Sequence, residues 1–188
     1  MKSATAILRT EHEAILKMLV VLENTAQHLE QGEAVSPALL DDLLEFFTVF
    51  ADRCHHGKEE DLLFPLLEQK GMPRIGGPVG CMLVEHDQGR AFIQTMRNNG
   101  ANCAAGDKSA KSAWAAAARG YANLLRNHIW KENEVLFRLA DQMISQEEQE
   151  TLTVEFERIE ETKLGAGVHA QLHSKMEKLV QELAPVEK

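Results

Sequence analysis

The chain has 188 residues, of which 44% are hydrophobic and 26% are charged, which is typical of one globular domain with a buried core. Its net charge of −9, without a dense basic face, argues against binding to nucleic acid or to an anionic membrane surface. Three well-separated cysteines without a CxxC motif, and an N-terminal stretch broken by charged residues, predict a cytoplasmic protein with no signal peptide or membrane span.

The first half of the sequence predicts two long helices. Apolar residues recur at helical spacing over residues 4–31, which predicts the first helix. Ser36 and Pro37 are a favourable N-cap and first helical residue for a second helix over 37–70. Pro65 should disturb this second helix because it lacks an N–H donor and crowds the preceding turn.

Two more long helices follow a clear break at GMPRIGGPVG. The third helix is predicted over 78–100, where Asn98-Asn99-Gly100 is a plausible C-terminal cap. The next segment, ANCAAGDKS, is predicted to be a loop. The Ala-rich stretch after it predicts a fourth helix over 109–143.

The C-terminal part predicts two further helices and completes the fold class. Ser145 with Glu148 three residues later resembles a capping box, which opens a helix over 146–163, and a last helix is predicted over 168–183. No segment alternates as a strand would. We therefore expect an all-α protein, in which residues 1–143 form an up-down-up-down four-helix bundle and residues 144–188 form a C-terminal helical extension packed on the bundle.

An internal repeat marks the second and fourth predicted helices. HHGKEEDLLF at 55–64 aligns with HIWKENEVLF at 128–137, and both have the pattern H-x-x-K-E-x-x-x-L-F. The alignment pairs His55 with Glu59 and His128 with Glu132, and it disfavours the alternative pair that begins at His56.

The spacing of each repeated pair suits a metal site. Residues four apart lie on one helix face, so an imidazole and a carboxylate can converge on one ion, or the carboxylate can bridge two. The other two long helices each have one histidine beside apolar residues, His12 and His86. Histidine and carboxylate ligands without a thiolate favour iron or manganese over a structural zinc site. The candidate ligands are therefore His12, His55, Glu59, His86, His128 and Glu132.

In this order of motifs, the chain resembles the hemerythrin-like, HHE cation-binding domain family. The family pattern is a lone histidine, then HxxxE, another lone histidine and a second HxxxE, and here it covers about residues 4–143. The resemblance implies a non-haem centre of two iron ions joined by an oxo or hydroxo bridge, and manganese or zinc are the alternatives. It also implies a small-molecule ligand such as O2, peroxide or NO.

The sequence departs from the oxygen carriers of this family on the third helix. The carriers have HxxxH there, whereas this chain has Arg90 four residues after His86. The missing ligand is His56, Glu60, a water molecule or nothing. Arg90 would place positive charge beside a bound anion. Tyr121 lies seven residues before His128 on the same face, so its hydroxyl either reaches the site or belongs to a core aromatic.

Three functions are consistent with this sequence. The first is a protein that binds, senses or reacts with O2 or a related oxidant. The second is an enzyme of oxidative or nitrosative stress, namely a di-iron peroxidase, an NO scavenger or an iron donor for cluster repair. The third is a structural helical module. His169 and His173, spaced as H-x-x-x-H, either bind zinc or pack on the bundle. We expect a monomer or a homodimer.

Overall fold

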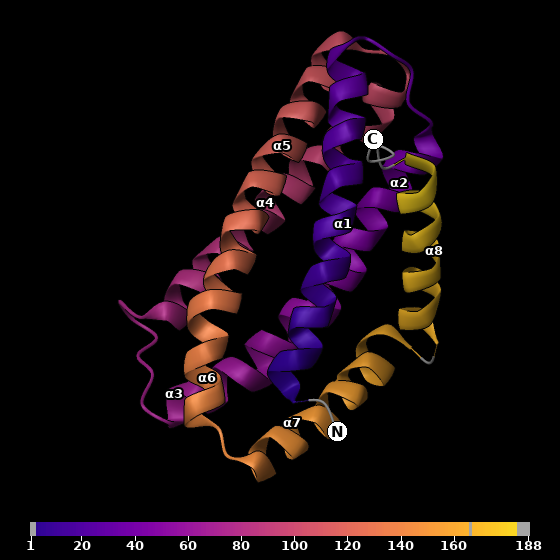
Figure 1. Cartoon of the computed structure of the whole chain (residues 1–188). Helices are drawn as coiled ribbons and strands as arrows, with labels where there is room; N and C mark the ends of the chain where they lie inside the picture. Colours follow the sequence, from indigo (N-terminus) through magenta and orange to yellow (C-terminus); the bar gives the residue numbers. More distant parts are fainter. Residues whose placement is uncertain (1–2, 166, 184–188) are drawn as a thin grey trace, which may run out of the picture.

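The computed structural model describes residues 3–165 and 167–183, and these are mostly helical with no strand among them. Figure 1 shows the α-helices in chain order. The elements named η in the text are π-helices, with wider turns than the α-helices. The elements are α1 (Ala4–Glu30), α2 (Pro37–Glu45), η1 (Phe46–His56), η2 (Glu59–Leu63), α3 (Phe64–Gln69), α4 (Pro78–Ala104), α5 (Lys108–Lys131), η3 (Glu132–Leu136), α6 (Phe137–Met143), α7 (Gln146–Ile159), η4 (Glu160–Leu164) and α8 (Val168–Leu183).

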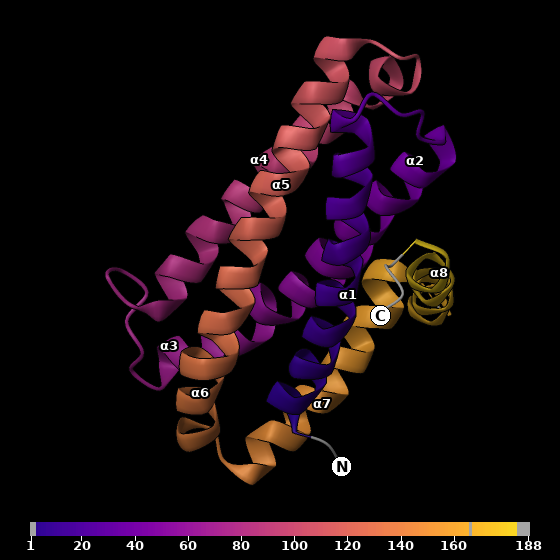
Figure 2. The same ribbon diagram turned by 45° about the horizontal axis from the view of Figure 1, so that its top comes forward.

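Four long helical segments lie alongside one another, and each runs in the opposite direction to the one before it (Figures 1 and 2). They are α1, the segment from α2 to α3, α4, and the segment from α5 to α6. The C-terminal helices contact the bundle: α7 packs against α1, η4 against η1, and α8 against both α1 and η1. The all-α prediction is confirmed for the described residues. None of their helices is both long and apolar enough to cross a membrane.

The predicted end of the third helix is wrong. Asn98-Asn99-Gly100 lies inside α4, which continues to Ala104 through the first four residues of the segment expected to be a loop. The chain turns at Gly106, whose φ of 91° is in the left-handed region that glycine adopts without a steric penalty. Asp107 then caps α5, because its side chain accepts a hydrogen bond from the Ala110 N–H at 2.7 Å.

The apolar core is divided by the polar site. One cluster fills the end of the bundle where α1 joins α2 and α4 joins α5, with Phe47, Trp114 and Leu125 among its members. A second cluster fills the end near α3 and α6 and contains Phe64 and Phe137, the phenylalanines that close the two copies of the repeat. The rings of these two residues stack on His86 and His12, with centroids 5.9 and 5.4 Å apart. The repeated Leu-Phe pairs therefore form an apolar wall beside the polar residues.

The N-terminal caps differ from the sequence predictions in one respect. Ser36 precedes Pro37 at the start of α2 as expected, but its side chain makes no capping hydrogen bond. The Ser145 capping box is confirmed, since Ser145 and Glu148 bond each other's backbone N–H groups.

Removing the Ser145 hydroxyl should destabilise the protein. We expect Ser145→Ala to lower the free energy of unfolding by about 1 kcal/mol, because the Glu148 N–H at the start of α7 loses its acceptor. Ser174→Ala, in the exposed middle of α8, is the matched control. Urea titration of both variants measures the difference. Equal stabilities would show that the cap contributes nothing.

Candidate metal centre

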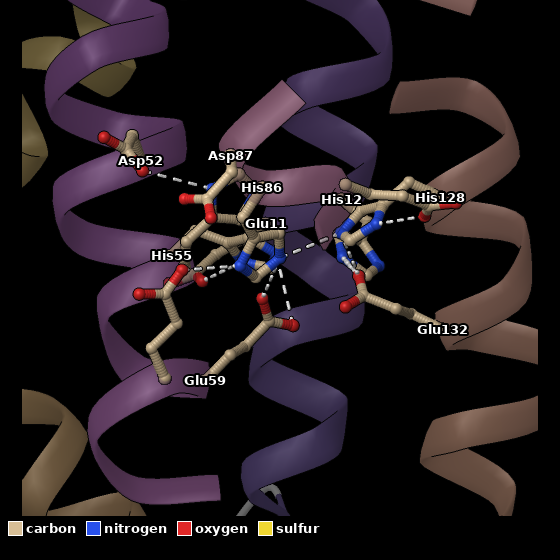
Figure 3. A network of polar contacts seen from close by, with 12 residues as sticks. Glu11, His12, Asp52, His55, Glu59, His86, Asp87, His128 and Glu132 are labelled. Atoms are coloured by element: carbon tan, nitrogen blue, oxygen red, sulfur yellow. Dashed lines mark hydrogen bonds and ion pairs between the residues drawn. The ribbon is translucent and has the colours of Figure 1, made fainter. Parts of the chain in front are cut away.

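Seven buried side chains from the four long segments meet in the middle of the bundle, and they form two clusters of possible ligand atoms. Figure 3 shows six of them pointing toward one another. One cluster consists of His12, His55, Glu59 and Glu132, and the other consists of His56, Glu59, His86 and His128. Within each cluster the ligand atoms all lie within 4.8 Å of one another. The six residues predicted from the motifs are therefore together, and His56 joins them.

The two glutamates connect the clusters: Glu59 belongs to both, and Glu132 belongs to the first and contacts a histidine of the second. The Glu132 Oε2 atom is 3.1 Å from His12 Nε2 and 3.2 Å from His128 Nε2. The Glu59 oxygens are each 3.6 Å from one histidine nitrogen, Nε2 of His55 and Nε2 of His86. Each carboxylate therefore touches a histidine from both clusters, which is the arrangement that a bridging carboxylate needs.

All five histidines of the clusters are oriented in the same way. The Nδ1 atom of each faces an oxygen acceptor outside the clusters, which leaves the other ring nitrogen directed inward. Outer hydrogen bonds of this kind fix the ring orientation of metal-binding histidines and raise their basicity. The Nδ1 distances are 2.9 Å from His12 to Asn133, 2.8 Å from His55 to Glu11, 3.4 Å from His56 to Asp52, 2.6 Å from His86 to Glu60 and 2.9 Å from His128 to Glu85.

The inward-facing atoms fit a cation better than they fit one another. The side-chain oxygens of Glu59 and Glu132 and the Nε2 atom of His12 are buried without a hydrogen-bond partner among the described residues. The Nε2 atoms of His86 and His128 face each other at 3.1 Å. Burying two carboxylates that face imidazole nitrogens without a hydrogen bond carries a large desolvation cost, which a bound cation removes. The donor set of imidazoles and carboxylates suits iron or manganese.

A π-helical turn begins at the glutamate of each repeat. Glu59 begins η2 and Glu132 begins η3, and the α-helix resumes at Phe64 and Phe137. Turns of this kind are rare and often occur at functional sites. Pro65 was expected to disturb its helix and follows the first π-turn directly, but the second copy has the same turn without a proline. Proline alone therefore does not explain the π-turns.

The remaining candidates lie around the clusters. Glu60 is outside them, where its carboxylate accepts hydrogen bonds from His86 Nδ1 and from Arg90. Arg90 also pairs with Asp52 and Asp87. The Arg90 guanidinium is therefore a cation matched by carboxylates, and not a free positive charge beside the clusters.

Tyr121 and Arg90 border a cavity of about 190 Å³ that reaches His56 and His86. Tyr121 is buried, and its ring packs edge-on against Phe47 with centroids 5.0 Å apart. Burial raises the pKa of the Tyr121 hydroxyl, so it is a neutral donor. Tyr121 is thus a core aromatic that borders the cavity beside the second cluster, and the reach of its hydroxyl to the site stays a prediction.

Of the two tail histidines, His173 is exposed and lies 3.6 Å from Glu177 on its own helix, whereas the side chain of His169 is outside the described residues.

Four outer partners of the histidines were missed in the sequence, although two of them carried a signal. Glu11 and Glu85 directly precede the two lone histidines, so the pair Glu-His occurs once on α1 and once on α4. Each glutamate bonds the histidine of a neighbouring helix, His55 or His128. Hydrogen bonds from His55 and Lys58 outweigh burial and lower the pKa of Glu11 to about 2. The other two, Asp52 and Asn133, had no comparable signal.

The pKa of Glu59 makes the metal-free fold sensitive to pH. Burial and the negative charge of Glu132 raise the pKa of Glu59 well above 4.5. A carboxyl group with a raised pKa stabilises the fold below its ordinary pKa, and that stabilisation is lost as the pH rises through the raised value. We therefore expect the contribution of Glu59 to the stability of the metal-free protein to be lost as the pH rises above 4.5. Burial lowers the pKa values of His55 and His56, and their contributions change in the opposite direction.

Glu59→Gln should stabilise the metal-free protein at neutral pH. The amide carries no charge and can donate a hydrogen bond to Glu132, so we expect a gain of about 1–3 kcal/mol. For a chain of this length the melting temperature should rise by roughly 2–4 °C per kcal/mol. Thermal unfolding in the presence of a chelator measures this, with the exposed Glu13→Gln as control. A melting temperature below that of the unmodified protein would contradict the expected relief of repulsion.

The fold and the site define a helical-bundle protein with a histidine and glutamate centre able to hold metal ions. The chain belongs to the hemerythrin HHE cation binding domain family, whose sequence profile matches residues 3–140. This confirms the family that the order of motifs predicted.

Similar proteins include bacterial proteins named for iron–sulfur cluster repair. Iron-sulfur cluster repair protein YtfE of Escherichia coli O157:H7 is 30% identical over 117 residues, which are 60% of this chain and 53% of that protein. The proteins of the same name from Escherichia coli O139:H28 (strain E24377A / ETEC) and Shigella boydii serotype 18 are each 28% identical over 131 residues, 67% of this chain and 59% of theirs. The chain therefore spans little more than half the length of these relatives.

Proposed function

We propose that this chain is a non-haem di-iron protein that binds or reacts with a small oxidant such as O2, peroxide or NO. The observation that carries the proposal is the common orientation of the five histidines around two carboxylates whose oxygens lack hydrogen-bond partners. Five imidazoles with fixed outer nitrogens and two bridging carboxylates are a donor set for a pair of iron ions. When bound, the two ions supply electrons to an oxidant.

The proposed ligand set is unequal at the two ions. Glu59 and Glu132 would be shared, His12 and His55 would hold one ion, and the other would have three histidines (His56, His86 and His128). The ion with two histidines has one protein ligand fewer, so we place the position for an external ligand there. His56 takes the role that the oxygen carriers give to the second histidine of HxxxH on the third helix.

The second candidate function is iron donation or NO scavenging in cluster repair. It rests on the similar proteins that are named for iron–sulfur cluster repair. The aligned part is little more than half of those proteins, so their whole activity is carried over here only as a proposal.

Stopped-flow mixing of the reconstituted diferrous protein with O2, peroxide or NO tests the proposal. A charge-transfer band that forms and reverses when the ligand is removed indicates binding, and turnover with an added reductant indicates an enzyme. Transfer of iron to an apo iron–sulfur protein indicates donation. If none of the three oxidants changes the spectrum and no iron is transferred, the proposal is wrong. Metal analysis of the protein as isolated decides between iron, manganese and zinc.

A further inference from the structure

A line of buried charges joins the C-terminal extension to the metal centre. The side chain of Lys58 is completely buried, although it is a lysine on the second long segment. Its ammonium group pairs with Glu11 on α1 and, at 2.5 Å, with Glu160 at the start of η4. Glu11 in turn accepts the His55 Nδ1–H at 2.8 Å. The line therefore runs from Glu160 through Lys58 and Glu11 to His55.

The ammonium group of Lys58 occupies the place of a third possible metal site. Glu11, Cys54 and Glu160 form a third cluster of possible metal ligands, but the ammonium group of Lys58 already pairs with both of its carboxylates. Burial raises the pKa of the Cys54 thiol to about 12, so it offers no thiolate there. Lys58 also lies 5.7 Å from the centre of the Phe156 ring on α7. The protein thus supplies its own cation at this place.

The extension is fixed over this part of the second segment by a second contact. Lys163 on η4 pairs with Asp61. Its Nζ atom would lie 3.2 Å from a Cβ atom added to Gly57, so a side chain at Gly57 would press on Lys163. Glu160 and Lys163 therefore flank the stretch that holds His55, His56 and Glu59.

We propose that Lys58 and Glu160 are positioning residues that set how strongly His55 donates electrons to its ion. This inference rests on the proposed di-iron centre, in which His55 binds the ion with two histidines. A carboxylate that accepts the outer N–H of a metal-binding histidine makes that histidine more basic. The positive charge of Lys58 weakens the effect of the Glu11 carboxylate on His55. Glu160 limits this weakening because it pairs with the same ammonium group.

The arrangement predicts shifts of opposite sign. Glu160→Gln removes one of the two carboxylates that pair with Lys58 among the described residues, so Lys58 acts more strongly on Glu11. His55 then becomes a poorer donor, and the reduction potential of the iron should rise. Lys58→Met removes the ammonium group from Glu11, which then polarises His55 more strongly, so the potential should fall. Removing a negative charge near the ions raises the reduction potential, and removing a positive charge lowers it. If Lys58 and Glu160 only held the fold together, the two substitutions would not shift the potential in opposite directions.

The test is a redox titration of the iron-loaded full chain, together with iron dissociation constants from competition with a chelator. We expect a higher potential and about tenfold weaker iron binding for Glu160→Gln. Glu160→Asp, which keeps the charge, should restore most of both. Glu161→Gln, the exposed neighbour on the same π-turn, is the control and should match the unmodified protein.

Each outcome decides the inference. If the unmodified chain holds no iron, the proposed function fails first. If Glu160→Gln holds iron with an unchanged potential and affinity, the positioning role is wrong while the di-iron proposal stands. If Lys58→Met lowers the potential, the opposite-sign prediction is supported, and a rise refutes it. If that variant does not fold, the Glu160 series decides alone.

Discussion

Replacing Glu59 with alanine is expected to eliminate iron binding at both positions of the candidate centre. Glu59 is the residue that belongs to both clusters of ligand atoms, and its oxygens approach His55 and His86 at 3.6 Å each. Without this carboxylate, five neutral imidazoles and Glu132 would have to balance the charge of two cations. We expect iron content to fall from about two ions per chain to near zero, measured after anaerobic reconstitution and desalting.

Glu60→Ala is the comparison variant, because it removes an outer hydrogen-bond partner and not a proposed ligand. Glu60 lies next in sequence, but its carboxylate faces the outer nitrogen of His86 and the guanidinium of Arg90 and belongs to neither cluster. Removing an outer partner weakens metal binding by about 10- to 100-fold without removing a ligand. Glu60→Ala should therefore still load with iron at high concentration. Full iron content in Glu59→Ala would overturn the bridging role.

Replacing His56 with alanine is expected to remove one of the two ions. His56 stacks on His86 with ring centroids 3.8 Å apart, and both belong to the cluster without His12 and His55. Losing one of three histidines should weaken that ion's binding by more than the roughly 10- to 100-fold that an outer partner contributes. Iron content should fall to about one ion per chain, measured by metal analysis of the desalted protein.

A second substitution tests whether His56 replaces the histidine that the third helix lacks. Arg90 borders the same cavity as His56 and His86, four residues after His86 on α4. Adding Arg90→His to the His56→Ala variant recreates HxxxH on that helix and should restore the second ion. Unchanged iron content in His56→Ala alone would show that His56 is not a ligand. His28→Ala, at an exposed histidine of α1, is the control.

The helices and the family could be predicted from the sequence because they depend on local periodicity and on a duplicated motif. The third helix was cut short because Asn98-Asn99-Gly100 resembles a cap, yet a helix tolerates one glycine when its neighbours pack. The turn was instead marked by Gly106, which has the positive φ, and by the capping residue Asp107.

The candidate site was predicted only in part. The repeat marks a histidine only where both copies have one, so a ligand present in one copy is not detected. The repeat selected His55 and Glu59 and passed over His56, whose counterpart in the second copy is Ile129. In the structure η1 ends at His56, and its wide turns separate consecutive residues by a smaller angle than an α-helix does, which brings both histidines inward. Spacing rules for α-helices do not predict this.

The contact between Lys58 and Glu160 lay beyond any local rule. The two residues are 102 positions apart, and each occurs in a charged stretch that reads as a solvated helix face. Only the packing of η4 on the second segment brings them together and buries the lysine. The relation of the C-terminal extension to the centre therefore required the tertiary structure.

Iron stoichiometry tests the central claim most directly. The chain is unfolded or chelated to remove metal, reconstituted anaerobically with ferrous iron, desalted, and analysed for iron and protein together. We expect about two iron ions per chain, the number that two clusters sharing carboxylates would hold. One ion or fewer per folded chain would contradict it.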